Sequence, residues 1–158
     1  MRVLIVTGLV LILDQASKYA VRSTMGLHES IPVIPNFFNL TYVTNSGMAF
    51  GLNFPGGIIF FTLASIILSG VLVRLLWIER NSHLLVRISL ALILAGAFGN
   101  LFDRLFRAEV VDFFDFYWDT YHFYIFNVAD SSVTVGIILY LWYSLILQPK
   151  SGSPIQTN

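Results

Sequence analysis

The chain has 158 residues, of which 56% are hydrophobic and 11% are charged, and its mean hydropathy is +0.76. These values lie outside the range of ordinary soluble domains and predict an integral membrane protein. Nine basic residues balance nine acidic ones, so no basic field favours nucleic acid, and the absence of cysteine excludes disulfides, thiolate metal sites and a cysteine nucleophile.

The first apolar segment covers about residues 3–21. Arg2 and the apolar run after it have the layout of a cleavable leader. Asp14 and Lys18, however, stand one helical turn apart and can pair on one face of a continuing helix. This pairing favours a span that is retained in the protein.

Three further apolar segments follow, at about residues 57–78, 84–102 and 123–147. Asp130 is the only charge of the last one. In the third, Ala91, Ala95 and Gly99 recur at every fourth position, a small-residue stripe that lets another helix approach closely. The chain length leaves room for about four spans of roughly 20 residues and little else.

We therefore expect one integral domain over residues 1–158, all-α, with four transmembrane helices and a small β-containing, aromatic-rich loop outside the membrane. The polar tail, 148–158, contains proline and glycine and is expected to fray.

The basic residues near the span ends predict the orientation in the membrane. Five lie on the side of the termini (Arg2, Arg74, Arg80, Arg87 and Lys150) and four on the other side (Lys18, Arg22, Arg104 and Arg107). Lys18 and Arg104 fall in polar clusters, and without them the count is five against two, which favours cytoplasmic termini and outer loops near 22–56 and 104–122.

The first outer loop contains many aromatic residues. Phe38, Leu40 and Tyr42 alternate with Asn39 and Thr41, and this two-residue period predicts a short strand. Aromatic side chains at headgroup level commonly anchor a protein in the interface. The alternative is a platform or lid over a lipidic substrate.

Polar residues at the predicted outer ends of three spans form the strongest functional signal. A charge in hydrocarbon costs several kcal/mol unless it is paired or hydrated, so several acids at one depth are hard to explain as accidents. The residues expected to converge there are Asp14, Lys18, Asn45, Asn100, Asp103, Arg104, Asp112, Asn127 and Asp130.

Asp112 and Asp130 are a possible carboxylate pair, with Asp130 expected one to two turns into the last helix. Two carboxyls in a poorly hydrated site titrate as a dyad that shares one proton. The ionised member can then activate water against an amide carbonyl while the protonated member polarises that carbonyl. This chemistry is aspartyl proteolysis without a covalent intermediate.

Five sequence blocks make the chain closely resemble the lipoprotein signal peptidases, also called signal peptidase II. The blocks are DQASK at 14–18, NSGMAFG at 45–51, AGAFGNLFDR at 95–104, VVDFFDF at 110–116 and FNVADSS at 126–132. In the third block Ala95 precedes Gly96 where the family more often has two glycines. The resemblance spans about residues 10–136.

The resemblance implies an intramembrane aspartic endopeptidase with Asp112 and Asp130 as its catalytic residues, separated by a membrane re-entry. It also implies cleavage of diacylglyceryl-modified prolipoproteins before the lipidated cysteine, in the outer leaflet of a bacterial inner membrane. Substrate contacts are expected from Asn45, Asn100, Arg104 and Asn127, while Asp14 and Lys18 fix the first helix. Gly96 and Asp103 are also expected to bind substrate or support the site. The alternative is that these groups, and Asp103, satisfy one another and the helix ends.

Other residues receive less specific interpretations. Asp115 and Asp119 are expected to be solvated loop charges, with Asp115 the nearest competitor to Asp112. His28, His83 and His122 lack metal-ligand spacing and fit surface loops. We expect no cofactor or metal, no nucleic-acid partner, and a monomer whose partners are its prolipoprotein substrates and membrane lipid.

Three rival functions remain open at this point. A serine–lysine hydrolase would use Ser131 or Ser132 with Lys18. A metal-dependent lipid transferase would use the two carboxylates of the DFFD sequence, Asp112 and Asp115. An ion-coupled carrier would use Asp14 and Asp130.

Overall fold

Four helices form the body of the protein. The computed structural model describes residues 2–46, 48–49, 52–53 and 56–147, so the expectation of a frayed tail over 148–158 lies outside the described residues. The helices are α1 (Leu4–Thr24), α2 (Gly57–Ile78), α3 (Leu84–Arg107) and α4 (Val128–Trp142). The short helix η1 (Glu79–Asn81) follows α2, and the π-helical turn η2 (Tyr143–Leu147) extends α4. All four helices, counted with these extensions, are long and apolar enough to cross a membrane, which confirms the expected spans.

The helix α3 lies in the middle of the bundle and is the most buried of the four spans. Ala91 and Ala95 are fully buried, and a methyl group on Gly99 would lie 2.6 Å from a carboxylate oxygen of Asp14. A methyl group on Gly96 would lie 2.2 Å from the carbonyl oxygen of Ala129 in α4. The predicted small-residue stripe therefore does allow close helix approach at Gly99, and Gly96, outside that stripe, allows a close approach of α4.

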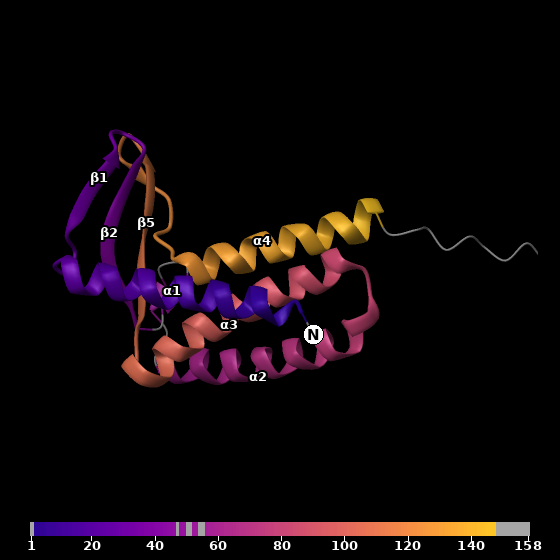
Figure 1. Ribbon diagram of the computed structural model, residues 1–158. Coiled ribbons are helices and arrows are strands. Elements are labelled where there is room, and N and C mark those ends of the chain that lie inside the picture. The colour runs from indigo at the N-terminus through magenta and orange to yellow at the C-terminus, as the bar shows by residue number, and fades with distance from the viewer. Residues whose placement is uncertain (1, 47, 50–51, 54–55, 148–158) are drawn as a thin grey trace, which may run out of the picture.

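A four-stranded antiparallel sheet stands across one end of the bundle (Figure 1). Its order is β1 (Ser30–Ile34), β2 (Phe38–Asn45), β5 (Val110–Trp118) and β6 (Tyr121–His122). A separate pair, β3 (Met48–Ala49) and β4 (Leu52–Asn53), follows β2 in the chain. The predicted strand near Phe38 is confirmed as part of β2, and the described residues also include β5 and β6 from the second outer loop, which the sequence analysis left unassigned.

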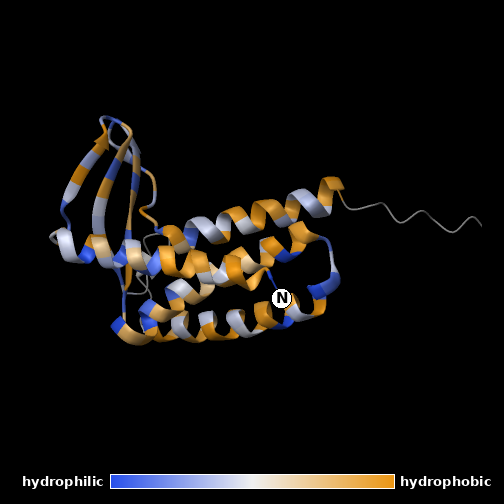
Figure 2. Ribbon diagram, viewed as in Figure 1, coloured by the Kyte–Doolittle hydropathy of each residue, from blue (hydrophilic) through white to orange (hydrophobic). Residues whose placement is uncertain are grey.

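The hydropathy of the elements divides the molecule into two parts. Apolar residues dominate the helices, whereas the sheet mixes polar and apolar positions along each strand (Figure 2). The first residues of α1 and the last of α4 lie at the end of the bundle away from the sheet (Figure 1). The sheet is therefore attached where α1, α3 and α4 present their polar ends.

The start of the fourth span differs from the prediction. The expected segment began at residue 123, but α4 begins at Val128. Residues 123–126 instead run beside β5, where the amides of Phe114 and Phe126 each donate to the other residue's carbonyl. Because Asn127 caps the helix, Asp130 is the third residue of its first turn, and the expectation of one to two turns was wrong.

Candidate active site

The strand β5 and the first turn of α4 bring Asp112 and Asp130 together. Asp112 is the third residue of β5 and pairs in register with Val43 of β2. The chain then turns back through β6 and runs antiparallel to β5 up to Phe126, directly before the helix cap. Residues 18 apart in the sequence are thus placed at one junction between the sheet and the bundle.

Asn127 contacts both aspartates with one side chain. Its amide nitrogen donates to the Asp112 carboxylate at 2.6 Å and to the Val111 carbonyl at 3.2 Å. Its amide oxygen accepts from the Asp130 backbone N–H at 3.0 Å, while the Asn127 N–H donates to the Asp130 carboxylate at 3.2 Å. The second pair of bonds is a capping box, so the residue that begins α4 also fixes the two carboxyl groups.

The second carboxylate oxygen of Asp130 is bound by α3. Asn100 donates its amide N–H to that oxygen at 2.7 Å. The amide oxygen of Asn100 accepts in turn from the Lys18 ammonium at 2.9 Å and from the Asn127 amide at 3.2 Å. Asn100 of α3 therefore links α1 and α4 to the same aspartate, so polar residues of these three helices meet at one place.

Behind this pair lies a charge cluster in which Asp14, Lys18 and Asp103 are fully buried and Arg107 is partly exposed. Lys18 contacts the carboxylates of Asp14 at 2.9 Å and Asp103 at 2.7 Å, and Arg107 contacts Asp103 at 2.5 Å. The predicted Asp14–Lys18 pair is thus present, but Asp14 also accepts a hydrogen bond from the Ala129 backbone at 2.9 Å. Asp14 therefore satisfies an N-terminal amide of α4 from a distant part of the sequence.

Gln15 and Arg107 are members of this cluster that the sequence analysis missed. The Gln15 amide donates to Asp14 and to the Gly99 carbonyl, and its oxygen accepts from Arg107. Arg107 stands four residues after Asp103, and this i, i+4 spacing is a signal that could have predicted the pair. Gln15 carried no such signal apart from its place in the DQASK block.

A hollow of about 360 Å³ opens beside Asp112. We call it the active-site hollow, and its lining residues are Val43, Thr44, Asn45, Asp112, His122, Phe123, Tyr124 and Ile125. Asn45 donates to the Tyr124 hydroxyl at 2.9 Å. Burial, followed by the charges of Asp112 and Asp130, raises the pKa of Tyr124, so its hydroxyl keeps its proton.

Asp112 is 4% exposed, and its environment favours the protonated carboxyl. Burial is the largest cause and the nearby charge of Asp130 the second; together they raise the pKa of Asp112 from 3.8 to about 7. The hydrogen bond from Asn127 and the charges of Lys18 and Arg104 act in the opposite direction. A carboxyl group whose pKa lies near 7, with a second carboxyl group beside it, is the arrangement that acid–base catalysis requires.

Arg104 and Gly96 occupy different places from the rest of the set. Arg104 donates to the Ser65 hydroxyl of α2 at 3.1 Å and lies over the ring of Phe61 at 5.9 Å. Gly96 lies at the contact between α3 and α4, one turn before Asn100. Of the block AGAFGNLFDR, Asn100 thus reaches the aspartate pair, while Gly96 sets the spacing of the helices.

Asp115 is not the solvated loop charge that was expected. It is 2% exposed in β5, accepts from the Thr41 hydroxyl at 2.7 Å and pairs with the His122 ring at 2.8 Å. The VVDFFDF segment lies in strand β5, which buries both aspartates, and a strand directs residues three apart to opposite faces. Asp112 and Asp115 therefore do not form the joint metal site of the lipid-transferase rival.

The neighbouring residues also argue against the serine–lysine rival. Ser131 donates to the Asn127 carbonyl at 2.8 Å, and Ser132 donates to the Ala129 carbonyl at 2.8 Å. Lys18 is held by two carboxylates and Asn100.

Asp119 is exposed at a turn, as expected, and His83 accepts a hydrogen bond at the start of α3.

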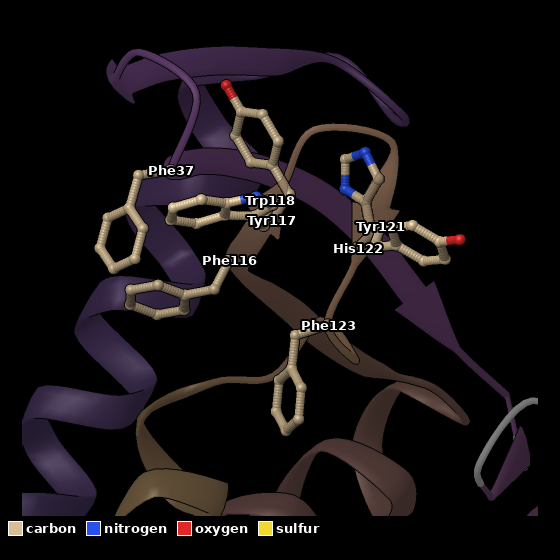
Figure 3. A pocket seen from close by; sticks show the side chains of 7 residues that line it. All are labelled: Phe37, Phe116, Tyr117, Trp118, Tyr121, His122 and Phe123. Atoms are coloured by element: carbon tan, nitrogen blue, oxygen red, sulfur yellow. The ribbon is translucent and has the colours of Figure 1, made fainter.

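A second, aromatic hollow of about 440 Å³ lies on the sheet (Figure 3). It gathers side chains from the β1–β2 connection and the β5–β6 hairpin, namely Phe37, Phe116, Tyr117, Trp118, Tyr121, His122 and Phe123. Phe37 meets Phe116 edge-on at 5.5 Å, and Tyr117 stacks on His122 at 5.2 Å. It shares His122 and Phe123 with the active-site hollow, so an apolar surface leads to Asp112.

Comparison with known proteins places these features in a family. The family model described as signal peptidase (SPase) II matches residues 6–146. The lipoprotein signal peptidase of Syntrophus aciditrophicus (strain SB) is 46% identical over 156 residues, which cover 95% of both chains. The lipoprotein signal peptidase of Geobacter sulfurreducens is 46% identical over 146 residues, which cover 91% of both chains.

Two solved structures of bacterial membrane enzymes, both determined by the in meso method, share the fold. One has a TM-score of 0.82 at 34% identity and covers 99% of this chain and 94% of its own. The other has a TM-score of 0.80 at 36% identity and covers 93% and 94%. The arrangement of four helices and a sheet is therefore that of known membrane enzymes.

Proposed function

The chain belongs to the signal peptidase II family of aspartic peptidases, and we propose that Asp112 and Asp130 are its catalytic pair. The proposed reaction is removal of the signal peptide from a diacylglyceryl-modified prolipoprotein, just before the lipidated cysteine. The observation that carries the proposal is the bridge from Asn127 to both carboxyl groups at the end of an apolar bundle.

In the proposed mechanism Asp112 carries the shared proton and Asp130 acts as the base. The raised pKa of Asp112 supports its role as the acid. Asp130 accepts hydrogen bonds on both oxygens and lies in the first turn of α4, where N–H donors and the helix dipole stabilise negative charge. Asp130 then takes a proton from water as the water attacks the scissile carbonyl, and Asp112 donates its proton toward that carbonyl and later the leaving nitrogen.

The remaining polar residues are proposed to position this pair. Asn100 and Asn127 hold the two carboxyl groups, and Asp14, Lys18 and Asp103 hold the helix ends that carry them. Asn45, with Tyr124, lines the active-site hollow and is placed to donate to the substrate backbone or lipid ester. Arg104 donates to Ser65 of α2 and interacts with the charges of Asp112 and Asp130, so we propose that this cation meets the same polar region of the substrate.

The aromatic hollow supports a lipid-bearing substrate. Its rings are apolar and join the active-site hollow through His122 and Phe123. We propose that the sheet rests on the membrane surface and that the diacylglyceryl group lies against these aromatic side chains. We also propose that the enzyme acts as a monomer, since Asn100 and Asn127 connect the two carboxyl groups without a second copy.

We also propose that both termini are cytoplasmic and that the sheet lies outside. Of the four basic residues counted on the sheet side, Lys18 and Arg107 pair with carboxylates inside the protein. Arg22 and Arg104 then remain on that side against five on the other. The scissile bond of a signal peptide would meet the aspartates at the outer leaflet.

Cleavage by purified full-length protein in detergent tests the proposal. The substrate is a diacylglyceryl-modified prolipoprotein, and a chelator is present. We expect Asp112→Asn and Asp130→Asn each to lower kcat/KM by about 10³ or more, since each removes an acid of a unit that acts together. Asp119→Asn is the matched control, because Asp119 is exposed at a turn with φ 55°, a backbone conformation that asparagine tolerates.

The outcomes separate the alternatives. Cleavage at the wild-type rate by either aspartate variant would remove that residue from the mechanism. Loss of wild-type activity on chelation, with recovery on adding Mg²⁺, would favour metal-assisted hydrolysis instead.

A further inference from the structure

Three helices enclose an apolar groove on the side of the bundle, away from the aspartates. It has a volume of about 290 Å³ and is lined by Leu72, Leu75 and Glu79 of α2–η1, Leu90 and Ile93 of α3, and Ile137, Tyr140 and Leu141 of α4. We call it the helix groove. A polar hollow of about 180 Å³ adjoins it and shares Glu79 and Tyr140, with Ser82, Val86, Tyr143 and Ser144 as its other residues.

The helix groove points along the bundle toward the active site. Ile93 lies seven residues before Asn100 in α3, and Ile137 lies seven residues after Asp130 in α4. Asn100 and Asp130 are hydrogen-bonded to each other. Leu72 follows by seven residues Ser65, which contacts Arg104. Residues seven apart lie on nearly the same helix face about 10 Å apart. The α3 and α4 walls of the groove therefore continue on the same face to Asn100 and Asp130, and the α2 wall continues to the contact between Ser65 and Arg104.

Glu79 lies at the end of the helix groove that is far from the aspartates. It is the one acidic residue of the nine in the sequence that lies outside the outer loops and the polar network around the aspartates. Its carboxylate accepts a hydrogen bond from the Ser82 hydroxyl. The nearby arginines bond elsewhere, since Arg80 donates to the Trp77 carbonyl and stacks on its ring, and Arg87 donates to the Arg80 carbonyl. The groove thus ends in a carboxylate that no arginine or lysine pairs with among the described residues.

We propose that the helix groove holds the apolar core of the substrate's signal peptide and that Glu79 pairs with the positively charged segment that precedes this core. The proposal rests on the proposed peptidase function, and it adds where the signal helix lies and what recognises its basic end. Signal peptides carry a basic segment, then an apolar core of about 7–15 residues, then the cleavage site.

Length and charge both fit this occupant. Ser65 and Glu79 are fourteen positions apart, which corresponds to about 21 Å of helix, and an apolar core of 7–15 residues spans about 10–22 Å when helical. With the cleavage site at the aspartates, the basic segment therefore reaches the level of Glu79. Leu75, Ile137 and Leu141 are each more than a third exposed, so these groove walls leave apolar surface for another helix.

Disulfide crosslinking tests the position of the signal helix independently of cleavage. Because the chain has no cysteine, Leu75→Cys introduces a unique thiol in the groove. Val73→Cys is the control, since Val73 is 48% exposed but stands on the opposite side of α2. Both are placed in the full-length Asp112→Asn variant, which keeps the α4 capping box, in lipid bilayers with a prolipoprotein that has one cysteine in its apolar core.

We expect crosslinking with Leu75→Cys at least tenfold above that with Val73→Cys. Equal crosslinking at the two positions, or none at Leu75→Cys, would mean that lipid fills the groove and would overturn the proposal. The lipidated cysteine of the substrate is a thioether and takes no part in the reaction.

Kinetics test the role of Glu79 in the otherwise wild-type enzyme. With a substrate whose basic segment has two lysines, Glu79→Gln should raise KM about threefold to fivefold, the range of a partly exposed ion pair, with kcat unchanged. With both lysines replaced by glutamine, the same variant should show no change. Glu79→Lys should recover a low KM on a substrate with two glutamates, and Glu109→Gln is the matched control.

The two functions can fail separately. If wild-type protein cleaves the substrate but Glu79→Gln changes KM by the same factor on the lysine and glutamine substrates, recognition by Glu79 is wrong and the peptidase function stands. If wild-type protein does not cleave, the peptidase function fails, and the crosslinking result still decides whether the groove holds a signal helix.

Discussion

Asn127 combines two roles that most residues keep apart, because it begins a helix and also holds the aspartate pair. Serine is as good a helix cap as asparagine but has no amide to donate to Asp112 and Asn100. We therefore expect Asn127→Ser to lower kcat/KM at least tenfold while the thermal unfolding midpoint changes little. Asn127→Ala should lower activity similarly and also cost about 1 kcal/mol of stability through the lost cap. Equal activity of Asn127→Ser and wild type would show that the amide bridge is not needed for catalysis.

Asp112 makes the activity depend on pH in a defined direction. Burial first, and then the charge of Asp130, raise its pKa to about 7, and the reaction as proposed needs Asp112 protonated. Raising the pH through 7 removes that proton, so kcat/KM should fall about tenfold per pH unit on the alkaline side. The Asn127 hydrogen bond lowers the pKa of Asp112, so Asn127→Ser should move the alkaline limb to higher pH. A pH–rate profile with a flat region from pH 6 to 9 would contradict this assignment.

Individual residues show where sequence patterns were sufficient and where they were not. The Asp14–Lys18 pair follows from i, i+4 spacing, which is local and therefore visible in the sequence. The partners of Asp115 are Thr41, from another strand, and His122, across a hairpin, so its burial depended on pairing that spacing does not encode. The contacts of Gln15 with Gly99 and Arg107 were out of reach for the same reason.

At the scale of elements, the contact between α3 and α4 fixes the distance between Asn100 and Asp130. A methyl group on Gly96 would lie 2.2 Å from the Ala129 carbonyl and 2.6 Å from Val133, so α4 must shift. We expect Gly96→Ala to destabilise the protein by about 1–3 kcal/mol and to lower kcat/KM more than tenfold. Gly70→Ala in α2 is the control, since a methyl group there meets no atom within 4 Å among the described residues. Thermal unfolding and cleavage assays on both variants decide the point, and equal behaviour of the two would remove the packing argument.

The elements also differ in how well the sequence predicted them. Hydropathy and length give the second span its observed bounds because its surroundings are apolar throughout. The last span was placed five residues early, since hydropathy does not distinguish an apolar segment that runs beside a strand, such as 123–126, from the start of a helix. The Asn127–Asp130 capping box is the local signal that marks the true start. The strand β5 was missed because its aspartates interrupt the apolar alternation.

In the whole molecule, the polar residues expected at the outer ends of the spans form one connected network, and the membrane explains why. Helix ends in an apolar medium need partners for their N–H groups and charges, so α1, α3 and α4 satisfy one another at a common depth. That requirement made the convergence predictable from four spans alone. The joining of the two outer loops into one sheet was not predictable, because the pairing of β2 with β5 connects segments about 70 residues apart.

The orientation of the molecule in the membrane gives the last prediction. If the sheet lies outside and the α2–α3 connection inside, a membrane-impermeant maleimide added to intact bacterial spheroplasts should label Tyr121→Cys and leave Asn81→Cys unlabelled. Both positions are exposed, and the chain has no cysteine of its own, so each variant reports one side of the membrane. Permeabilising the cells should make Asn81→Cys react as strongly as Tyr121→Cys, which controls for thiol reactivity. The reverse pattern in intact cells would place the aspartates at the cytoplasmic surface, where the bias of basic residues argues against them.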